Sequence, residues 1–216
     1  MSDAFQTGRL SDKMKVILAY IIARSAWEFY DSDWMSRSWT AEDIHFMQEL
    51  ACDNDDVEPL IFINRPYLAV RREDASIIES ETSSVIGQIH RYPRILALGM
   101  MLIEIGTGRR ARSLFSNYHE NLNSDWHSAR QFLSKTVPWD GFDYRAFWDA
   151  TRNCVNNKLF LKGPIARIGG HTLVDIEARR RIIFEDVVTP LGDLLSGTGW
   201  IHDICTVGSM KPPWIR

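Results

Sequence analysis

One apolar run constrains the fold of this chain more than any other feature. The run ILALGMMLIEI occupies residues 95–105, and Gly106 and Gly108 follow it. It exceeds the roughly four to eight residues of a typical buried strand, and its leucine, methionine and alanine favour helix. Large apolar residues recur at helical spacing along one face, and the other face is also apolar up to Glu104. The run therefore predicts a buried helix, around which the rest of the chain must pack.

The two glycines admit a second interpretation. A glycine-rich turn between a strand and a helix can hold a nucleotide or S-adenosylmethionine, because its backbone amides approach the ligand closely. Such a site also needs an acidic residue closing a second strand about twenty residues later, and residues 112–133 show no strand pattern. We therefore expect Gly106 to end the helix in a left-handed conformation. A nucleotide- or S-adenosylmethionine-dependent transferase that uses the Gly106–Gly108 loop remains the alternative function.

Helical spacing also occurs near the start of the chain and throughout its second half. Ser11 is placed to cap a first helix with a wide apolar stripe. Later helices are predicted in residues 125–137, 144–160 and 175–195. In the last of these, one side is shared by Ile176, Ile183, Val187, Leu191 and Leu194. Pro190 is expected to kink or end a turn there.

Short extended segments lie between the first helix and the central one, at Ile44–Met47, Leu60–Asn64 and Tyr67–Val70. The chain has 216 residues and is 45% apolar, which suffices for one full core. The fold class expected is mainly α with a small β insert. We expect one domain over residues 11–205, a disordered N-terminus at 1–10 and a C-terminal tail at 206–216.

Charge and cysteine content narrow the classes of function. The net charge of −3 gives no general reason to bind nucleic acid or an anionic membrane. The three cysteines are widely spaced and form no CxxC pair, so neither a disulfide framework nor a zinc site is indicated. The sequence shows no secretory signal and no uncharged apolar run of membrane-spanning length. These features predict a cytoplasmic protein without a metal or membrane site.

The motifs occur in an order that resembles the C-terminal lobe of the protein kinase fold. The pattern W-x4-W-T-x2-D-I runs from Trp34 to Ile44, PYLAV follows at residues 66–70, and the glycine-containing run continues to Arg110. The segment RRIIFEDVVTPL, at residues 180–191, closes the series. More narrowly, the chain resembles a fungal kinase-like domain family of unknown function, often found beside prion-inhibition or HeLo-type helical domains. The resemblance implies a C-lobe without the N-lobe, because the residues before Ser11 are too few to form one.

The resemblance also implies that the catalytic positions are degenerate. Ser38 stands where a kinase has its catalytic Asp, and Asp43 stands where it has a metal-binding Asn. Arg65 opens an RPY tripeptide in place of Asp-Phe-Gly, and Arg94 replaces the aspartate at the start of the buried helix. A single carboxylate is a poor Mg²⁺ site. We therefore expect no catalysis, no cofactor and no bound metal.

A missing N-lobe would leave part of the remaining lobe uncovered, and such apolar area marks interfaces. The residues expected to form an interaction surface are Trp34, Arg37, Trp39, Arg65 and Tyr67. Aromatic and arginine side chains of this kind are enriched in interface hot spots. Alternatively, Trp39 packs beneath its own loop, against the helix that begins near Ser11. The expected function is a non-enzymatic interaction or regulatory module in fungal signalling or incompatibility-type responses, which binds a protein partner or a second copy of itself.

Overall fold

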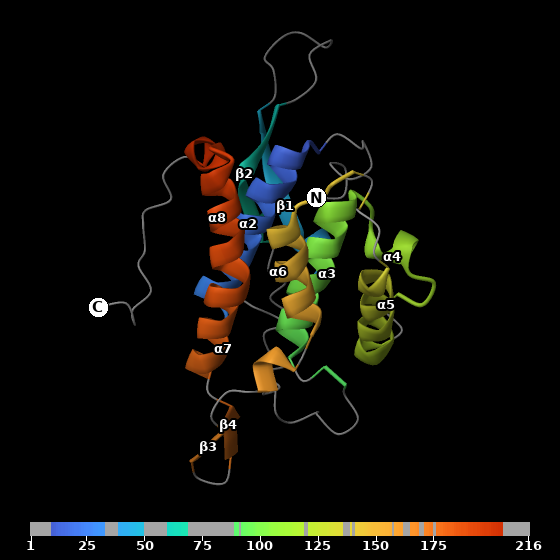
Figure 1. The fold of residues 1–216 in the computed structure, drawn as a ribbon, viewed down its shortest axis with the longest axis vertical. Helices are drawn as coiled ribbons and strands as arrows, with labels where there is room; N and C mark the ends of the chain where they lie inside the picture. Colours follow the sequence, from blue (N-terminus) through green and yellow to red (C-terminus); the bar gives the residue numbers. More distant parts are fainter. Residues whose placement is uncertain are drawn as a thin grey trace, which may run out of the picture.

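The computed structural model describes residues 10–32, 39–49, 60–68, 89–90, 92–118, 121–135, 139, 141–156, 158–161, 165–168, 171–174 and 176–204. These residues form a mainly helical body with two β-hairpins at opposite ends (Figure 1). None of the helices in these ranges is long and apolar enough to span a bilayer. The expected class, mainly α with a small β component, is confirmed. The expected N-terminus and C-terminal tail fall almost wholly outside the described residues.

The elements follow one another as predicted for the central helix and its neighbours. The helices are α2 (Asp12–Glu28), α3 (Pro93–Thr107), α4 (Ala111–Leu114), α5 (Leu122–Ser134), α6 (Arg145–Val155), α7 (Ile176–Ile183) and α8 (Thr189–Gly197). A π-helix, η4 (Phe184–Val188), joins α7 to α8, and 3-10 turns occur at η1 (Ala41–Asp43), η3 (Leu159–Leu161) and η5 (Trp200–Asp203). The strands are β1 (Ile44–Glu49), β2 (Leu60–Leu68), β3 (Ile165–Ile168) and β4 (His171–Val174).

Helix α3 lies at the centre of the body, as the apolar run predicts. It packs against α2, α5 and α6, and all but two of its residues are buried. Proline opens its first turn, where the missing N–H costs nothing. A cofactor loop at Gly106–Gly108 would need a strand before it. Residues 95–105 form a helix, so this segment does not form the strand–turn–helix unit of such a loop.

The expected position of the helix cap is wrong by two residues. Gly108, with φ of 65°, adopts the left-handed conformation, whereas Gly106 remains inside the helix and is buried. A Cβ atom at Gly106 would collide with the ring of Trp139. Glycine at position 106 therefore lets an aromatic ring approach the helix backbone, and glycine at position 108 supplies the turn.

Helix α2 begins where the sequence places it. The hydroxyl of Ser11 accepts a hydrogen bond from the Met14 amide at 3.4 Å, which caps the helix. The Lys15 ammonium donates to the carbonyl of Gly106 at 3.1 Å. This contact joins the first turn of α2 to the last turn of α3, where the carbonyl end of the helix dipole favours a cation.

The extended segments expected at Ile44–Met47 and Leu60–Asn64 are confirmed, and they pair in an antiparallel hairpin of β1 and β2. Ile44 pairs with Leu68 at one end, and the register shifts between Phe46 and Met47. The two segments expected at residues 60–64 and from Tyr67 onward form one strand, although Val70 lies outside the described residues. The second hairpin, β3–β4, was not predicted, even though a Gly-Gly pair between its strands is a recognised hairpin signal.

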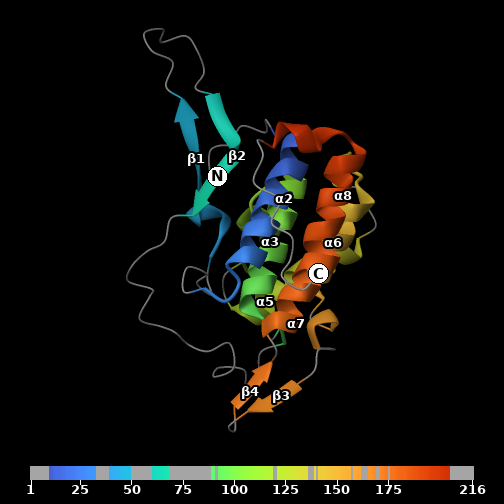
Figure 2. The same cartoon turned by 90° about the vertical axis from the view of Figure 1, so that its left-hand side faces the viewer.

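The last helical segment changes its winding before Pro190. Proline cannot donate to the carbonyl of Asp186 four residues earlier, so an unbroken α-helix would leave that oxygen without its partner. The chain instead forms the π-helix η4, and the side-chain amide of Asn153 donates to the Asp186 carbonyl at 3.0 Å. Helices α7 and α8 stay in one column (Figure 2). Pro190 therefore widens a turn without ending the helix.

The apolar stripe expected along this segment is only partly correct. Ile183, Val187 and Leu191 are buried as predicted, but Ile176 is 37% exposed. Leu194 is only half-buried, while Leu195 is fully buried. The wide turn lies before Leu194 and shifts the phase of the residues that follow it, so that Leu195 faces the core in place of Leu194. Ile176 lies at the start of α7, before that turn.

Candidate functional site

The structure places only some of the predicted site residues. Trp34, Arg37 and Ser38 lie outside the described residues. Arg65 and Tyr67 lie in β2, where the backbone is described, and Tyr67 is opposite His45 in the hairpin. The arrangement of the five predicted surface side chains therefore remains a prediction, except at Trp39.

Trp39 is buried, with 6% of its surface exposed, so it does not form an exposed anchor. Its indole N–H donates to the carbonyl of Arg94 at 3.3 Å. The ring is thus fixed against the start of α3. The alternative in which Trp39 packs beneath its own loop is closer to the structure, although the polar contact is to the central helix.

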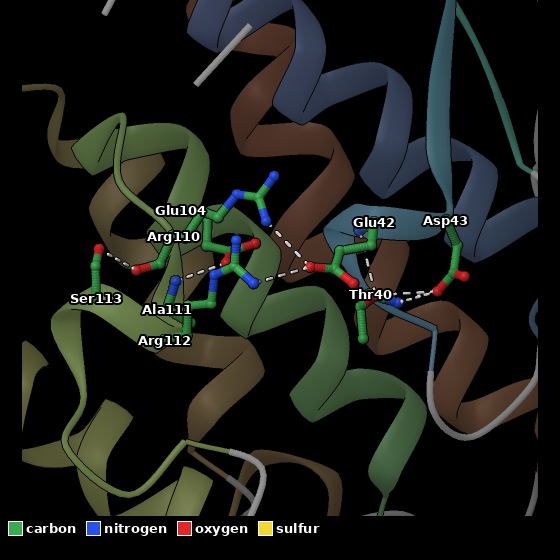
Figure 3. A network of polar contacts seen from close by, with 8 residues as sticks. All are labelled: Thr40, Glu42, Asp43, Glu104, Arg110, Ala111, Arg112 and Ser113. Carbon is green, nitrogen blue, oxygen red and sulfur yellow. Dashed lines mark hydrogen bonds and ion pairs between the residues drawn. The ribbon is translucent and has the colours of Figure 1, made fainter. Parts of the chain in front are cut away.

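Asp43 uses its carboxylate to close the turn η1. Its Oδ2 atom accepts from the Thr40 amide at 2.7 Å and from the Thr40 hydroxyl at 3.1 Å (Figure 3). The Thr40 hydroxyl in turn accepts from the Glu42 amide at 3.2 Å. This reciprocal capping box satisfies the free amides of the turn. The carboxylate of Asp43, which the kinase resemblance would place at a metal position, is therefore engaged in local folding.

Arg94 lies in the first turn of α3 and donates from Nη1 to the carbonyl of Tyr30, just past the end of α2. The contact joins two helices that pack together. A guanidinium attracts the carbonyl oxygens at a helix end, whereas it would repel a metal cation. Arg94 thus contributes to the packing of the two central helices.

A pocket of about 190 Å³ opens beside Trp39 and η1, over the buried helix α3. Most of its wall is apolar, and four oxygen-bearing side chains join it: Thr40, Glu104, Tyr118 and Asp125. The lining residues are Trp39, Thr40, Ala41, Pro93, Leu96, Ala97, Met100, Met101, Glu104, Tyr118, Leu122 and Asp125. An apolar cavity with a few converging polar groups is the usual form of a small binding site.

Glu104 is the most unusual residue of this pocket, because it carries a carboxyl group on the buried helix α3. It is 5% exposed, and Oε1 accepts a hydrogen bond from the Ala111 amide at 2.6 Å (Figure 3). Burial raises the pKa of Glu104 from 4.5 to about 7, although the Ala111 amide and nearby arginines oppose the shift. At neutral pH the side chain is therefore divided between its charged and neutral forms.

The arginines nearest to Glu104 are bonded to a different carboxylate. Arg110 and Arg112 place Nη1 at 3.1 and 3.6 Å from Oε1 of Glu42, on the outer side of η1. Figure 3 shows both guanidinium groups directed toward Glu42. These ion pairs connect η1, which precedes β1, with the segment after α3, and they lie beside the pocket.

Asp125 and Tyr118 are two further oxygen-bearing side chains that line the pocket. Asp125 is 7% exposed and lies in the first turn of α5, which Asn121 caps. The pKa of Tyr118 is raised above its usual range, by burial first and then by the charges of Glu104 and Asp125. The three side chains thus interact electrostatically across one small volume.

Sequence reasoning did not single out Glu104 or Asp125. The signal for Glu104 was present, because it is the one charged residue in the apolar run. Asp125 carries no comparable signal, since acidic residues are common in the first turn of a helix. Within the described ranges, no three His, Cys, Asp or Glu side chains are grouped to hold a metal ion.

One comparison with known proteins gives a match. A family model described as "Domain of unknown function (DUF7580)" matches residues 1–198. No curated protein matches the chain, and no solved structure matches it.

Proposed function

We propose, from the premise that this chain belongs to the DUF7580 family, that it is a non-catalytic interaction module. Its architecture is proposed to be that of a kinase C-lobe without the N-lobe, and its partner to be a protein or a second copy of itself. The kinase likeness is carried by the motifs around Trp39, Asp43 and Arg94 and by the order of their elements.

The observation that supports the non-catalytic assignment best is the engagement of Asp43 in the capping box. In a working kinase, the matched side chain must direct an oxygen at Mg²⁺. Here Oδ2 of Asp43 is bonded to Thr40 twice, at 2.7 and 3.1 Å. The guanidinium of Arg94 is likewise bonded to the carbonyl of Tyr30. Both side chains at matched positions that the structure describes thus have roles in folding.

We expect the purified chain not to bind Mg·ATP, because a divalent cation needs several oxygen ligands and the matched positions supply one carboxylate. Calorimetric titration with ATP and Mg²⁺ measures this directly, and a titration with EDTA in place of Mg²⁺ identifies any metal-dependent heat. Magnesium-dependent binding in the micromolar range that is lost in Asp43→Asn would make Asp43 a metal ligand and overturn the proposal.

The interaction surface is tested by the double substitution Trp34→Ala with Tyr67→Ala. If these rings are interface anchors, the variant keeps its melting temperature and loses self-association, measured by sedimentation over a concentration series. Trp39→Ala is the comparator, because it removes a buried ring and is expected to lower the melting temperature. A double variant that melts much earlier, or that associates as strongly as the wild type, would show that Trp34 and Tyr67 are not anchors.

A further inference from the structure

The pocket over α3 contains a buried anion with an open side. Glu104 is 5% exposed and lines the cavity, yet only one of its oxygens bonds to the Ala111 amide. Its other oxygen accepts no hydrogen bond from any residue that the structure describes. Burying a carboxylate costs free energy unless hydrogen bonds or a counter-charge offset it. Because Glu104 lines the pocket, this second oxygen can accept a hydrogen bond from a donor that enters it.

A second acidic residue adds to the negative potential of the same cavity. Asp125 is 7% exposed and reaches the pocket from α5, while Glu104 reaches it from α3. Arg110 and Arg112 reduce this potential only in part, since both guanidinium groups lie within 4 Å of Glu42. The charge of the site thus complements a cation.

The rest of the pocket wall is apolar and aromatic, which indicates what kind of group would accompany the cation. Leu96, Met100 and Met101 offer apolar contacts along α3, and Trp39 and Tyr118 offer aromatic rings. Aromatic rings attract ammonium groups, and methionine adapts to aliphatic chains. A volume of about 190 Å³ suits a short aliphatic chain.

We propose that this pocket binds a primary ammonium group on a short aliphatic stem, with Glu104 accepting its hydrogen bond, Asp125 supplying further negative charge and the α3 wall covering the stem. The ammonium belongs either to a free alkylamine or to a lysine side chain of a protein partner, because the two present the same chemistry. The proposal of an ammonium site rests only on the residues that line the pocket. It is therefore independent of the kinase assignment and of the result of the Mg·ATP titration.

The first test is calorimetric titration with n-hexylammonium at pH 8, where Glu104 is ionised, beside the neutral isostere n-hexanol. A hydrogen bond to a charged group contributes about 1.5–3 kcal/mol, so the amine should bind at least about tenfold more tightly than the alcohol. Glu104→Gln keeps an oxygen for the Ala111 amide and should remove that preference. Asp149→Asn neutralises a half-exposed acid on α6, away from the pocket, and should leave it unchanged.

A second variant tests whether the amine binds in this pocket, and a second ligand tests whether the ammonium group comes from a protein or from a small molecule. Ala97→Phe fills the pocket from α3 while keeping both acids, and it should abolish binding of amine and alcohol alike. A lysine-containing peptide that binds more tightly than its acetyl-lysine form would make a protein the source, and preference for the free amine would make it a small molecule. Equal binding of hexylammonium and hexanol, or no binding of any amine by a folded protein, would overturn the proposal.

Discussion

Gly106→Leu is expected to destabilise the protein by at least about 3 kcal/mol, the upper end of what overpacking a core usually costs. A Cβ atom at this position already collides with the ring of Trp139, and Phe147 lies at 3.0 Å from it. Neither ring can retreat easily, since Trp139 meets Phe147 edge-on in the core, with centroids 6.0 Å apart. Chemical denaturation of both proteins gives the difference in unfolding free energy.

Two further variants separate this clash from the general effect of replacing a helical glycine. Gly197 ends α8, and a Cβ atom there would meet nothing within 4 Å, so Gly197→Leu should leave the stability nearly unchanged. In a Trp139→Ala background, the additional cost of Gly106→Leu should fall because the ring is gone. An undiminished cost in that background would show that Trp139 is not the obstacle.

Glu104→Gln is expected to stabilise the protein at pH 8 by up to about 3 kcal/mol and to have little effect at pH 5. Burial raises the pKa of Glu104 from 4.5 to about 7, so the folded state holds its proton more tightly than the unfolded state. The stability linked to the protonated form is complete below pH 4.5 and is lost as the pH rises through about 7. Glutamine remains neutral at both values and avoids that loss.

The measurement is the difference in unfolding free energy between Glu104→Gln and the wild type from pH 5 to pH 8. Taking the difference matters, because the pKa of His90 is lowered to about 4 by burial, and this group weakens both proteins as the pH falls below 6.5. Asp149→Asn, which removes a half-exposed carboxylate on α6, is the control for removing an acid outside the pocket. A difference that stays constant across this range would mean that Glu104 titrates normally.

The centre of the fold could be predicted because its signals are local. The composition and spacing of residues 95–105 are enough to distinguish a helix from a strand, and the capping residue Ser11 predicts the start of α2. The end of α3 could not be placed in the same way. Gly106 and Gly108 are equivalent in the sequence. Only the structure shows that the ring of Trp139, far along the chain, packs against Gly106 inside the helix, whereas Gly108 takes the left-handed turn.

The candidate site was harder to predict than the fold. Tryptophan is a residue type that is common in interfaces, but the sequence does not show that Trp39 is buried against the start of α3. Asp43 looks like a remnant of a metal site until its bonds to Thr40 are seen. The pocket itself is formed where η1, α3 and α5 meet, and no single segment contains its pattern.

The wide turn before Pro190 bears on how sequences of this family should be compared. It holds one residue more than an α-turn while α7 and α8 remain in one column. A relative without the proline needs one residue fewer between Ile183 and Leu191 to bury the same two faces. A gap of one position there would thus be a difference in winding and not a loss of structure, and the amide of Asn153 would no longer be needed at that carbonyl.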